Sequence, residues 1–160
     1  MESVVTLASD RDAGELLTLQ RAAYVTKAQA HHDMNLPPLT QSLDELIVEL
    51  TRPDIIAFGL RDGAQRLLAA VRVSFCLPDP HTAELARLVV APDMQGRGLG
   101  SRLLELAEER LPEPVTNLQL FTGEHSFGNL RLYSRFGYRE THRTSTGGGY
   151  ALVHLTKRVR

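Results

Sequence analysis

A glycine-rich turn between residues 88 and 101 has the residue types and spacing that most clearly indicate chemistry. The stretch reads Leu-Val-Val-Ala-Pro-Asp-Met-Gln-Gly-Arg-Gly-Leu-Gly-Ser, so an apolar run passes through glycines into a segment with helical spacing of leucines. A helix that begins in such a turn presents free backbone N–H groups at its positive end, with no side chains in the way. Such termini bind phosphate or pyrophosphate. The sequence therefore predicts a site for a phosphate-bearing cofactor.

Two widespread phosphate-binding motifs do not fit this turn. A Walker loop ends in Gly-Lys-Ser/Thr, and the stretch contains no lysine. The dinucleotide fingerprint requires glycines at the first, third and sixth positions. Here they stand at Gly96, Gly98 and Gly100, and Ser101 occupies the place of the third. No acidic residue with the right strand context follows about 20 residues later. A module that binds ATP or NAD through the helix terminus remains an alternative.

The turn resembles the coenzyme A loop of the GCN5-related N-acetyltransferases, whose signature is Gln/Arg-x-x-Gly-x-Gly/Ala. Gln95, Gly98 and Gly100 fill this signature without departure. The resemblance implies that backbone amides of the turn, with the Gln95 side chain nearby, hold the pyrophosphate of acetyl-CoA. It also implies that the preceding strand bonds the pantetheine arm and that arginines bind the phosphates. The residues assigned to the cofactor are Leu88, Val89, Val90, Gln95, Gly96, Arg97, Gly98, Leu99, Gly100 and Ser101, with Arg102 as a further candidate.

A second segment, residues 122–138, resembles the Asn-x-x-Leu-Tyr-x-x-x-Gly-Phe/Tyr region of the same family. Asn129 matches the asparagine that bonds the cofactor arm. In many members an asparagine stands three residues earlier, at Ser126 here, so both positions remain candidates. Tyr133 matches the tyrosine near the cofactor sulfur, and it is the candidate general acid for the leaving thiolate. The alternatives are a helix N-cap for Asn129 and a core aromatic for Tyr133.

The expected reaction is attack of a primary amine on the thioester carbonyl. A free amine with a pKa of ~10 is mostly protonated at neutral pH, so the reaction needs a base or a water path. Glu84 is the candidate base, because it lies 11 residues before Gln95, where histone-acetylating members of the family place a catalytic glutamate. Glu124 and His125 are the substitutes, and a solvated role for Glu84 is also open.

The acceptor is expected to bind beside the loop that contains His31, His32 and Asp33, because the resemblance places this loop at the acceptor site. These three residues either contact the acceptor or are ordinary polar loop residues. Direct attack requires no nucleophilic residue. Cys76 follows the end of a predicted strand and has no neighbouring histidine in sequence, so it is expected to be a buried small hydrophobe, and an acyl-carrying nucleophile is the alternative. We predict no metal site, because no histidine–cysteine or histidine–carboxylate spacing recurs with ligand geometry.

The composition is that of a single domain, residues 1–160, and it limits the partners. Hydrophobic residues make up 42% of the chain and charged residues 23%, and the formal net charge of −1 gives no field that favours nucleic acid. The single cysteine indicates a reducing compartment. No apolar run is long enough to span a membrane, and the N-terminus lacks a signal pattern. We expect a cytoplasmic protein without nucleic-acid or membrane partners, and a homodimer is the default assembly.

Hydrophobic periodicity predicts the elements that position these residues. Strands are expected over 4–7, 55–60, 66–75, 84–90, 118–122, 138–143 and 150–157. Helices are expected over 10–30, 42–50, 99–111 and 129–136, the first capped by Asp10 or Asp12 and the second opened by a capping box at Ser42 and Glu45. The order β-α-α-β-β-β-α-β-α-β-β matches the acetyltransferase family. It implies an α/β fold with a mixed, splayed sheet of about seven strands and helices on both faces.

The expected activity is transfer of an acetyl group from acetyl-CoA to the primary amine of a small molecule. The loop around residues 37–39 and the glycines at 147–149 are expected to shape the acceptor pocket. A protein or peptide acceptor is an alternative, and so is a non-catalytic acyl-CoA-binding regulator on the same fold.

Overall fold

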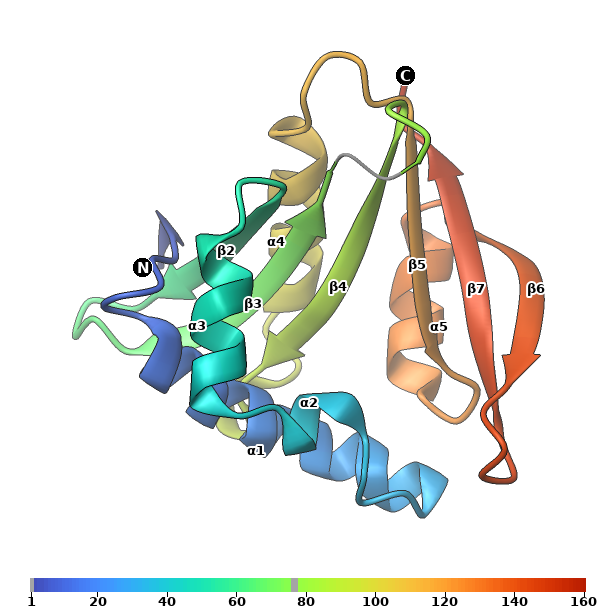
Figure 1. Cartoon of the computed structure of the whole chain (residues 1–160), viewed down its shortest axis with the longest axis horizontal. Coiled ribbons are helices and arrows are strands. Elements are labelled where there is room, and N and C mark those ends of the chain that lie inside the picture. Colours follow the sequence, from blue (N-terminus) through green and yellow to red (C-terminus); the bar gives the residue numbers. More distant parts are fainter. Residues whose placement is uncertain (1, 76–77) are drawn as a thin grey trace.

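The structure is a computed structural model that describes residues 2–75 and 78–160, so the prediction for Cys76 lies outside the described residues. In this part of the chain, seven strands form one mixed sheet in the order β1-β2-β3-β4-β5-β7-β6, with helices on both faces (Figure 1). The predicted fold class is confirmed. The strands are β1 (Ser3–Thr6), β2 (Ile55–Arg61), β3 (Leu67–Ser74), β4 (Thr82–Val90), β5 (Asn117–Gly123), β6 (Arg139–Ser145) and β7 (Ala151–Arg158). The helices are α1 (Ala13–His31), α2 (Pro37–Thr40), α3 (Leu43–Thr51), α4 (Leu99–Glu109) and α5 (Phe127–Arg135).

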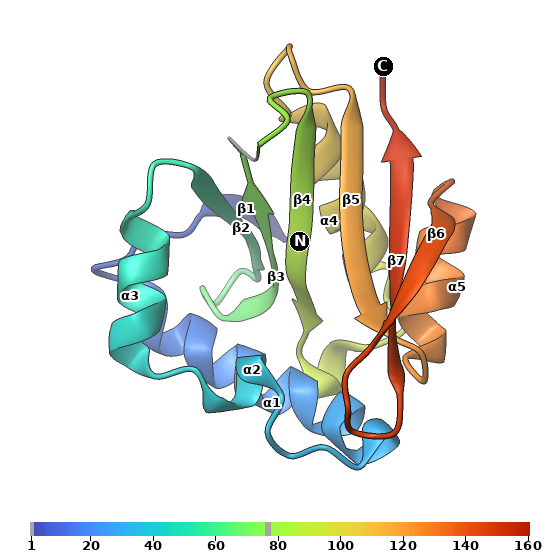
Figure 2. The same cartoon turned by 45° about the vertical axis from the view of Figure 1, so that its right-hand side comes forward.

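The sheet opens between its two central parallel strands. β4 pairs with β5 only where Thr82–Glu84 faces Asn117–Gln119. Beyond these residues the two strands diverge, and α1 crosses below the open end (Figures 1 and 2). Unpaired backbone groups of β4 therefore line a wedge in the middle of the sheet.

A bulge in β4 lies beside this wedge. Arg72 of β3 pairs with Ala86, whereas Ala70 pairs with Val89, so β4 has one residue more than its neighbour. Within the bulge Arg87 adopts a left-handed conformation with φ of 55°. The usual alternation of side chains is interrupted here, and residues 85–88 all border the same cavity.

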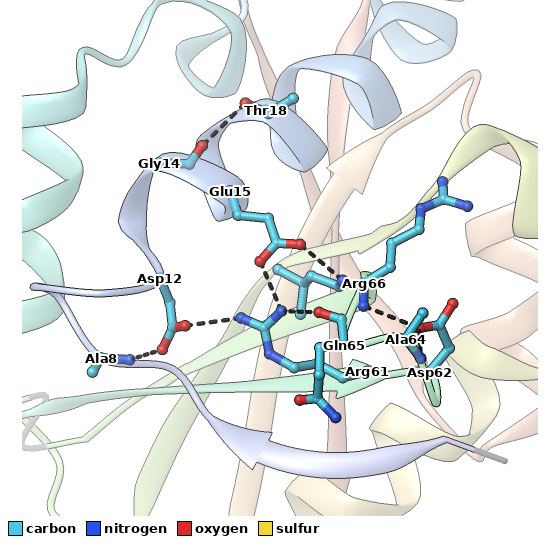
Figure 3. A network of polar contacts seen from close by, with 11 residues as sticks. Ala8, Asp12, Gly14, Glu15, Thr18, Arg61, Asp62, Ala64, Gln65 and Arg66 are labelled. Carbon is cyan, nitrogen blue, oxygen red and sulfur yellow. Dashed lines mark hydrogen bonds and ion pairs between the residues drawn. The ribbon is translucent and has the colours of Figure 1, made fainter.

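The start of α1 is fixed to the hairpin between β2 and β3 (Figure 3). Arg61 donates to Asp12 at 2.8 Å and to Glu15 at 2.7 Å, and Glu15 also accepts from the Leu67 N–H at 2.9 Å. Asp12 stands at the N-cap position, but its carboxylate accepts from the Ala8 N–H and from Arg61 instead of capping the helix. The predicted N-cap position is therefore confirmed for Asp12, but the expected side-chain bond to the helix is absent, because tertiary partners take the carboxylate.

Residues 37–40, expected as loop, form the short helix α2, which begins with Pro37 at a position that lacks a helical N–H partner. A buried network holds it: Gln20 of α1 donates to the Pro38 carbonyl at 2.9 Å and accepts from Arg72 at 2.8 Å. Arg72 also pairs with Glu49 of α3 at 2.5 Å. The capping box at the start of α3 is confirmed.

None of the helices in the described ranges has the length and apolar character needed to cross a bilayer.

Candidate active site

A groove of about 860 Å³ lies between the glycine turn and α5. Gly96 and Gly98 adopt left-handed conformations, with φ of 78° and 77°, which permit the sharp entry into α4. A Cβ atom at Gly100 would lie 3.3 Å from Leu132 Cδ2, so α4 packs tightly against α5 at this glycine. The groove thus has a floor of exposed backbone.

The first turn of α4 offers N–H groups to this groove. Gly98 is the N-cap and has no side chain to cap the helix, and the helical bond that it accepts comes from the Arg102 N–H at 3.1 Å. The N–H groups of Leu99, Gly100 and Ser101 therefore precede the first helical bond. The Gln95 side chain donates to the Val90 carbonyl at 2.9 Å, so it braces the turn from within.

The arginines of the groove differ from those selected in the sequence. Arg97 is exposed and does not line the groove, and Arg102 binds Glu2 at 3.3 Å. Arg131 and Arg135 of α5 line it instead. Their i, i+4 spacing on a short helix was a signal that sequence reasoning missed.

A second cavity, of about 460 Å³, opens on the other side of the wedge. Its walls are largely apolar and aromatic, with Leu36, Pro38, Leu85, Phe121, Tyr133, Tyr150 and Leu152 among them. Lys27, Leu88 and Asn129 line both this cavity and the groove. The two spaces therefore meet at the wedge between β4 and β5.

Tyr133 and its neighbours on α5 stand at this junction. Tyr133 is 5% exposed, and its ring packs edge-on against Tyr138 while it borders the second cavity. Burial raises the pKa of Tyr133 above its usual range, so the phenol keeps its proton. Because α5 begins at Phe127, Asn129 lies within its first turn and is not the N-cap. Ser126 lines the same cavity, and its buried hydroxyl has no hydrogen-bond partner.

The three candidate bases do not line either cavity. Glu84 lies where β4 and β5 are still paired, and its carboxylate accepts from Gln119 at 3.2 Å. Leu85 and Ala86, which follow Glu84 in β4, line the second cavity, so Glu84 lies just outside its wall. Glu124 accepts from the Ala151 N–H at 2.7 Å and pairs with Arg143, and His125 is exposed.

His31 fastens the end of α1 to the end of β5. Its Nδ1 bonds the Lys27 carbonyl at 2.8 Å, and its Nε2 accepts from the His125 N–H at 3.0 Å, so the ring connects the two elements. The ring lies so close to Gly123 that a Cβ there would overlap with Nε2. His32 is exposed at the C-cap, whereas Asp33 lines the cavity and accepts from the Tyr150 hydroxyl at 2.6 Å. That bond is the main reason that the pKa of Asp33 is lowered.

Tyr24, Lys27 and Arg87 also line the second cavity, and sequence reasoning did not assign them to a site. Tyr24, Lys27 and His31 share one stripe of α1, because three and four residues separate them. A lysine and a histidine on the same helical stripe as buried apolar residues were the sequence signal that could have assigned this stripe to a site. Burial lowers the pKa of Lys27 to about 8, and burial raises that of Tyr24, with Arg87 opposing the rise.

A sheet opened between two parallel strands, with a glycine turn on one side and a second cavity on the other, is the architecture of a coenzyme A-dependent acyltransferase. Residues 16–138 match the acetyltransferase (GNAT) family, and the chain belongs to that family, whose acyl donor is acetyl-CoA. A comparison with curated protein sequences gives no significant match.

Solved structures with the same fold are distant in sequence. An acetyltransferase from Thermus thermophilus has 20% identity and a TM-score of 0.76, with 99% of this chain and 97% of that chain covered. The ribosomal-protein-S18-alanine N-acetyltransferase of Escherichia coli has 19% identity and a TM-score of 0.79, with 99% and 94% covered. A PaiA N-acetyltransferase from Thermoplasma acidophilum, solved with coenzyme A, has 18% identity and a TM-score of 0.81, with 99% of both chains covered.

The groove fits coenzyme A in chemistry as well as in position. Its backbone donors lie next to the glycine turn, and the unpartnered Ser126 hydroxyl lines the second cavity, which meets the groove at the wedge. These groups are what a diphosphate and an amide-containing arm require.

Proposed function

We propose that the protein is an N-acyltransferase that moves an acetyl group from acetyl-CoA to the primary amine of a small molecule by direct attack. The observation that carries this proposal is the junction at the wedge, where Lys27, Leu88 and Asn129 border both the groove and the second cavity. An acyl donor laid in the groove would present its thioester there. An amine in the second cavity would then have direct access to it, and no acyl-enzyme is needed.

The cofactor supplies an activated thioester, and the chain's own groups hold it in place. The N–H groups of residues 99–101 and the guanidinium groups of Arg131 and Arg135 would bind its phosphates. Backbone groups of Leu88, Val89 and Val90, which face the wedge without a β5 partner, would bond its arm as an added strand does. Asn129 and Ser126 would donate or accept hydrogen bonds at the end of the cofactor arm that carries the thioester.

Tyr133 is proposed as the hydrogen-bond donor to the departing thiolate. Its raised pKa keeps the hydroxyl protonated over the working range of pH. A thiolate, with a pKa of ~8.5 for its thiol, is a weaker base than such a phenolate, so Tyr133 would stabilise the leaving group mainly through a hydrogen bond.

Glu84 is proposed as a base that acts through water. Glu84 stands four residues before Leu88 in β4, roughly 13 Å along an extended strand, which leaves room for water between its carboxylate and an amine beside Leu88. The residue is half-buried. Water in this space would carry the proton from the amine to Glu84.

The volume of the second cavity favours a small acceptor over a protein, because 460 Å³ lies within the usual range of about 300–1,000 Å³ for small-molecule pockets. The test is release of free thiol from acetyl-CoA with a library of small amines and with peptides. Thermal stabilisation by acetyl-CoA, ATP and NAD is measured beside it. Thiol release with peptides alone would exclude a small-molecule enzyme, and stabilisation by acetyl-CoA without turnover would indicate a binding module.

A further inference from the structure

Two cations line the second cavity without an acidic partner. In the described chain, Lys27 and Arg87 both border this cavity, and no carboxylate oxygen lies within 4.0 Å of either. Arg72, the other arginine beneath α1, is in contrast paired with Glu49 and bonded to Gln20. Arg72 therefore has an ionic partner within the fold, whereas Lys27 and Arg87 adjoin the Tyr24 side chain and have no carboxylate partner within 4.0 Å in the described chain.

The position of Arg87 follows from the bulge in β4. Its left-handed backbone brings the side chain to the cavity although its neighbours Ala86 and Leu88 reach the same space. The Arg87 Nε atom is buried and has no hydrogen-bond partner. A buried guanidinium N–H without an acceptor is unfavourable, and a bound anion would satisfy it.

Lys27 approaches the same place from α1. Its Nζ lies 4.5 Å from the centre of the Tyr24 ring, and the pKa of Tyr24 responds to Arg87, so both cations adjoin one aromatic side chain. Asp33 is the acidic group that lines the same cavity in the described chain. Its carboxylate lies more than 4.0 Å from the charged nitrogens of Lys27 and Arg87, and it accepts instead from the Tyr150 hydroxyl and the Asn35 N–H.

We propose that the acceptor is an α-amino acid with an apolar side chain, whose carboxylate is bound by Lys27 and Arg87 while its amine faces the wedge; this inference rests on the proposed function. Lys27 borders the junction itself, so an anion bound there lies next to the attacking amine, as the α-carboxylate of an amino acid does. The rest of the cavity, with Leu36, Pro38 and Phe121, suits an apolar side chain. A nearby cation also favours the neutral, nucleophilic form of the amine.

The test compares leucine, methionine and phenylalanine with their carboxamides and their decarboxylated amines as acceptors. The amine of a carboxamide is less basic and more often neutral, so a preference for the free acid cannot come from intrinsic reactivity. We expect the wild type to favour the acids by about 10- to 100-fold in kcat/KM, the range of a charge-assisted hydrogen bond. Arg87→Gln and Lys27→Met should remove this preference, mainly through KM. Arg87→Lys should retain part of it, and the exposed control Arg139→Gln should retain all of it.

A second measurement does not depend on turnover. N-acetylleucine should stabilise the wild type against heat more than N-acetylleucinamide does, and Arg87→Gln should abolish the difference. Efficient acetylation of amines without preference for the acids would overturn this inference and leave the proposed function intact. Absence of acetylation with every amine, despite binding of acetyl-CoA, would overturn the proposed function. If N-acetylleucine and N-acetylleucinamide stabilise the wild type equally, the inference about the carboxylate site is overturned as well.

Discussion

Replacement of Lys27 by methionine should stabilise the free protein, because it removes a half-buried cation that has no acidic partner. Methionine keeps the unbranched shape of the side chain and its contact with the Tyr24 ring. The pKa of Lys27 falls from an ordinary 10.5 to about 8 on burial. At about 1.4 kcal/mol per pH unit, this difference sets an upper bound of ~3.5 kcal/mol for the cost of the charge. Partial exposure of the side chain reduces it, so we expect a gain of about 1–2 kcal/mol, or roughly 3–6 °C in Tm.

The gain should depend on pH with a defined sign. Below pH ~8 Lys27 is protonated in both the folded and the unfolded chain, so the folded protein bears the whole cost of the charge. Between pH ~8 and ~10.4 the folded state loses its proton first, and the wild type becomes relatively more stable. The advantage of Lys27→Met should therefore be greatest near pH 7 and should shrink toward pH ~10.4.

Urea denaturation of both proteins at several pH values between 7 and 10 measures this difference. Lys157→Met is the matched control, because Lys157 is the other lysine of the chain and pairs with Glu108 at 2.6 Å. The control should lose stability, since a partly buried carboxylate is left without its partner. A gain for Lys27→Met that does not vary with pH would show improved packing alone, and a loss at pH 7 would refute the reasoning about the charge.

Three further substitutions test other parts of the site. Tyr133→Phe should lower kcat by about 10²-fold and leave the affinity for acetyl-CoA unchanged. The shape of the pH profile should also stay the same, because the buried phenol does not titrate in the working range of pH. Unchanged turnover in steady-state assays would exclude Tyr133 as the donor to the leaving group. Glu84→Gln should lower kcat by about 10²-fold, the usual contribution of a general base, and leave the affinity for acetyl-CoA unchanged; unchanged turnover would point to water or another residue as the base. Gly123→Ala should destabilise the protein by about 1–3 kcal/mol in urea denaturation, because the new Cβ overlaps with the His31 ring and breaks its bond to the His125 N–H; wild-type stability would mean that the ring is free to move.

The parts of the fold that could be predicted are those that local sequence controls. The glycine turn, the capping box at Ser42 and the leucine-rich helix α4 depend on residues that are close in the chain. The side-chain cap by Asp12 could not be judged in this way, because its competitor Arg61 is distant in sequence. The short helix α2 likewise depends on Gln20, which binds its Pro38 carbonyl across the fold.

The same limit applies to the candidate site. Its glycine turn and Tyr133 could be predicted, because both belong to motifs of contiguous residues. Arg87 belongs to a strand, and without the bulge its direction would follow the alternation of its neighbours; only the paired register of β3 and β4 reveals the exception. Arg102 looked suitable for phosphate because it follows the turn, but its partner is Glu2, at the far end of the chain.

The two expected effects of Lys27→Met have opposite signs, and together they separate a functional cation from a structural one. A structural lysine, such as Lys157, stabilises the free protein through its partner, and its loss should lower stability without a specific effect on acidic acceptors. Lys27 lacks such a partner, so its removal should stabilise the free protein while it weakens the binding of a carboxylate. An anionic ligand at 100 times its Kd would contribute about 2.7 kcal/mol to stability, which is enough to offset the cost of the buried charge. The lysine is therefore expected to be unfavourable only until the acceptor binds.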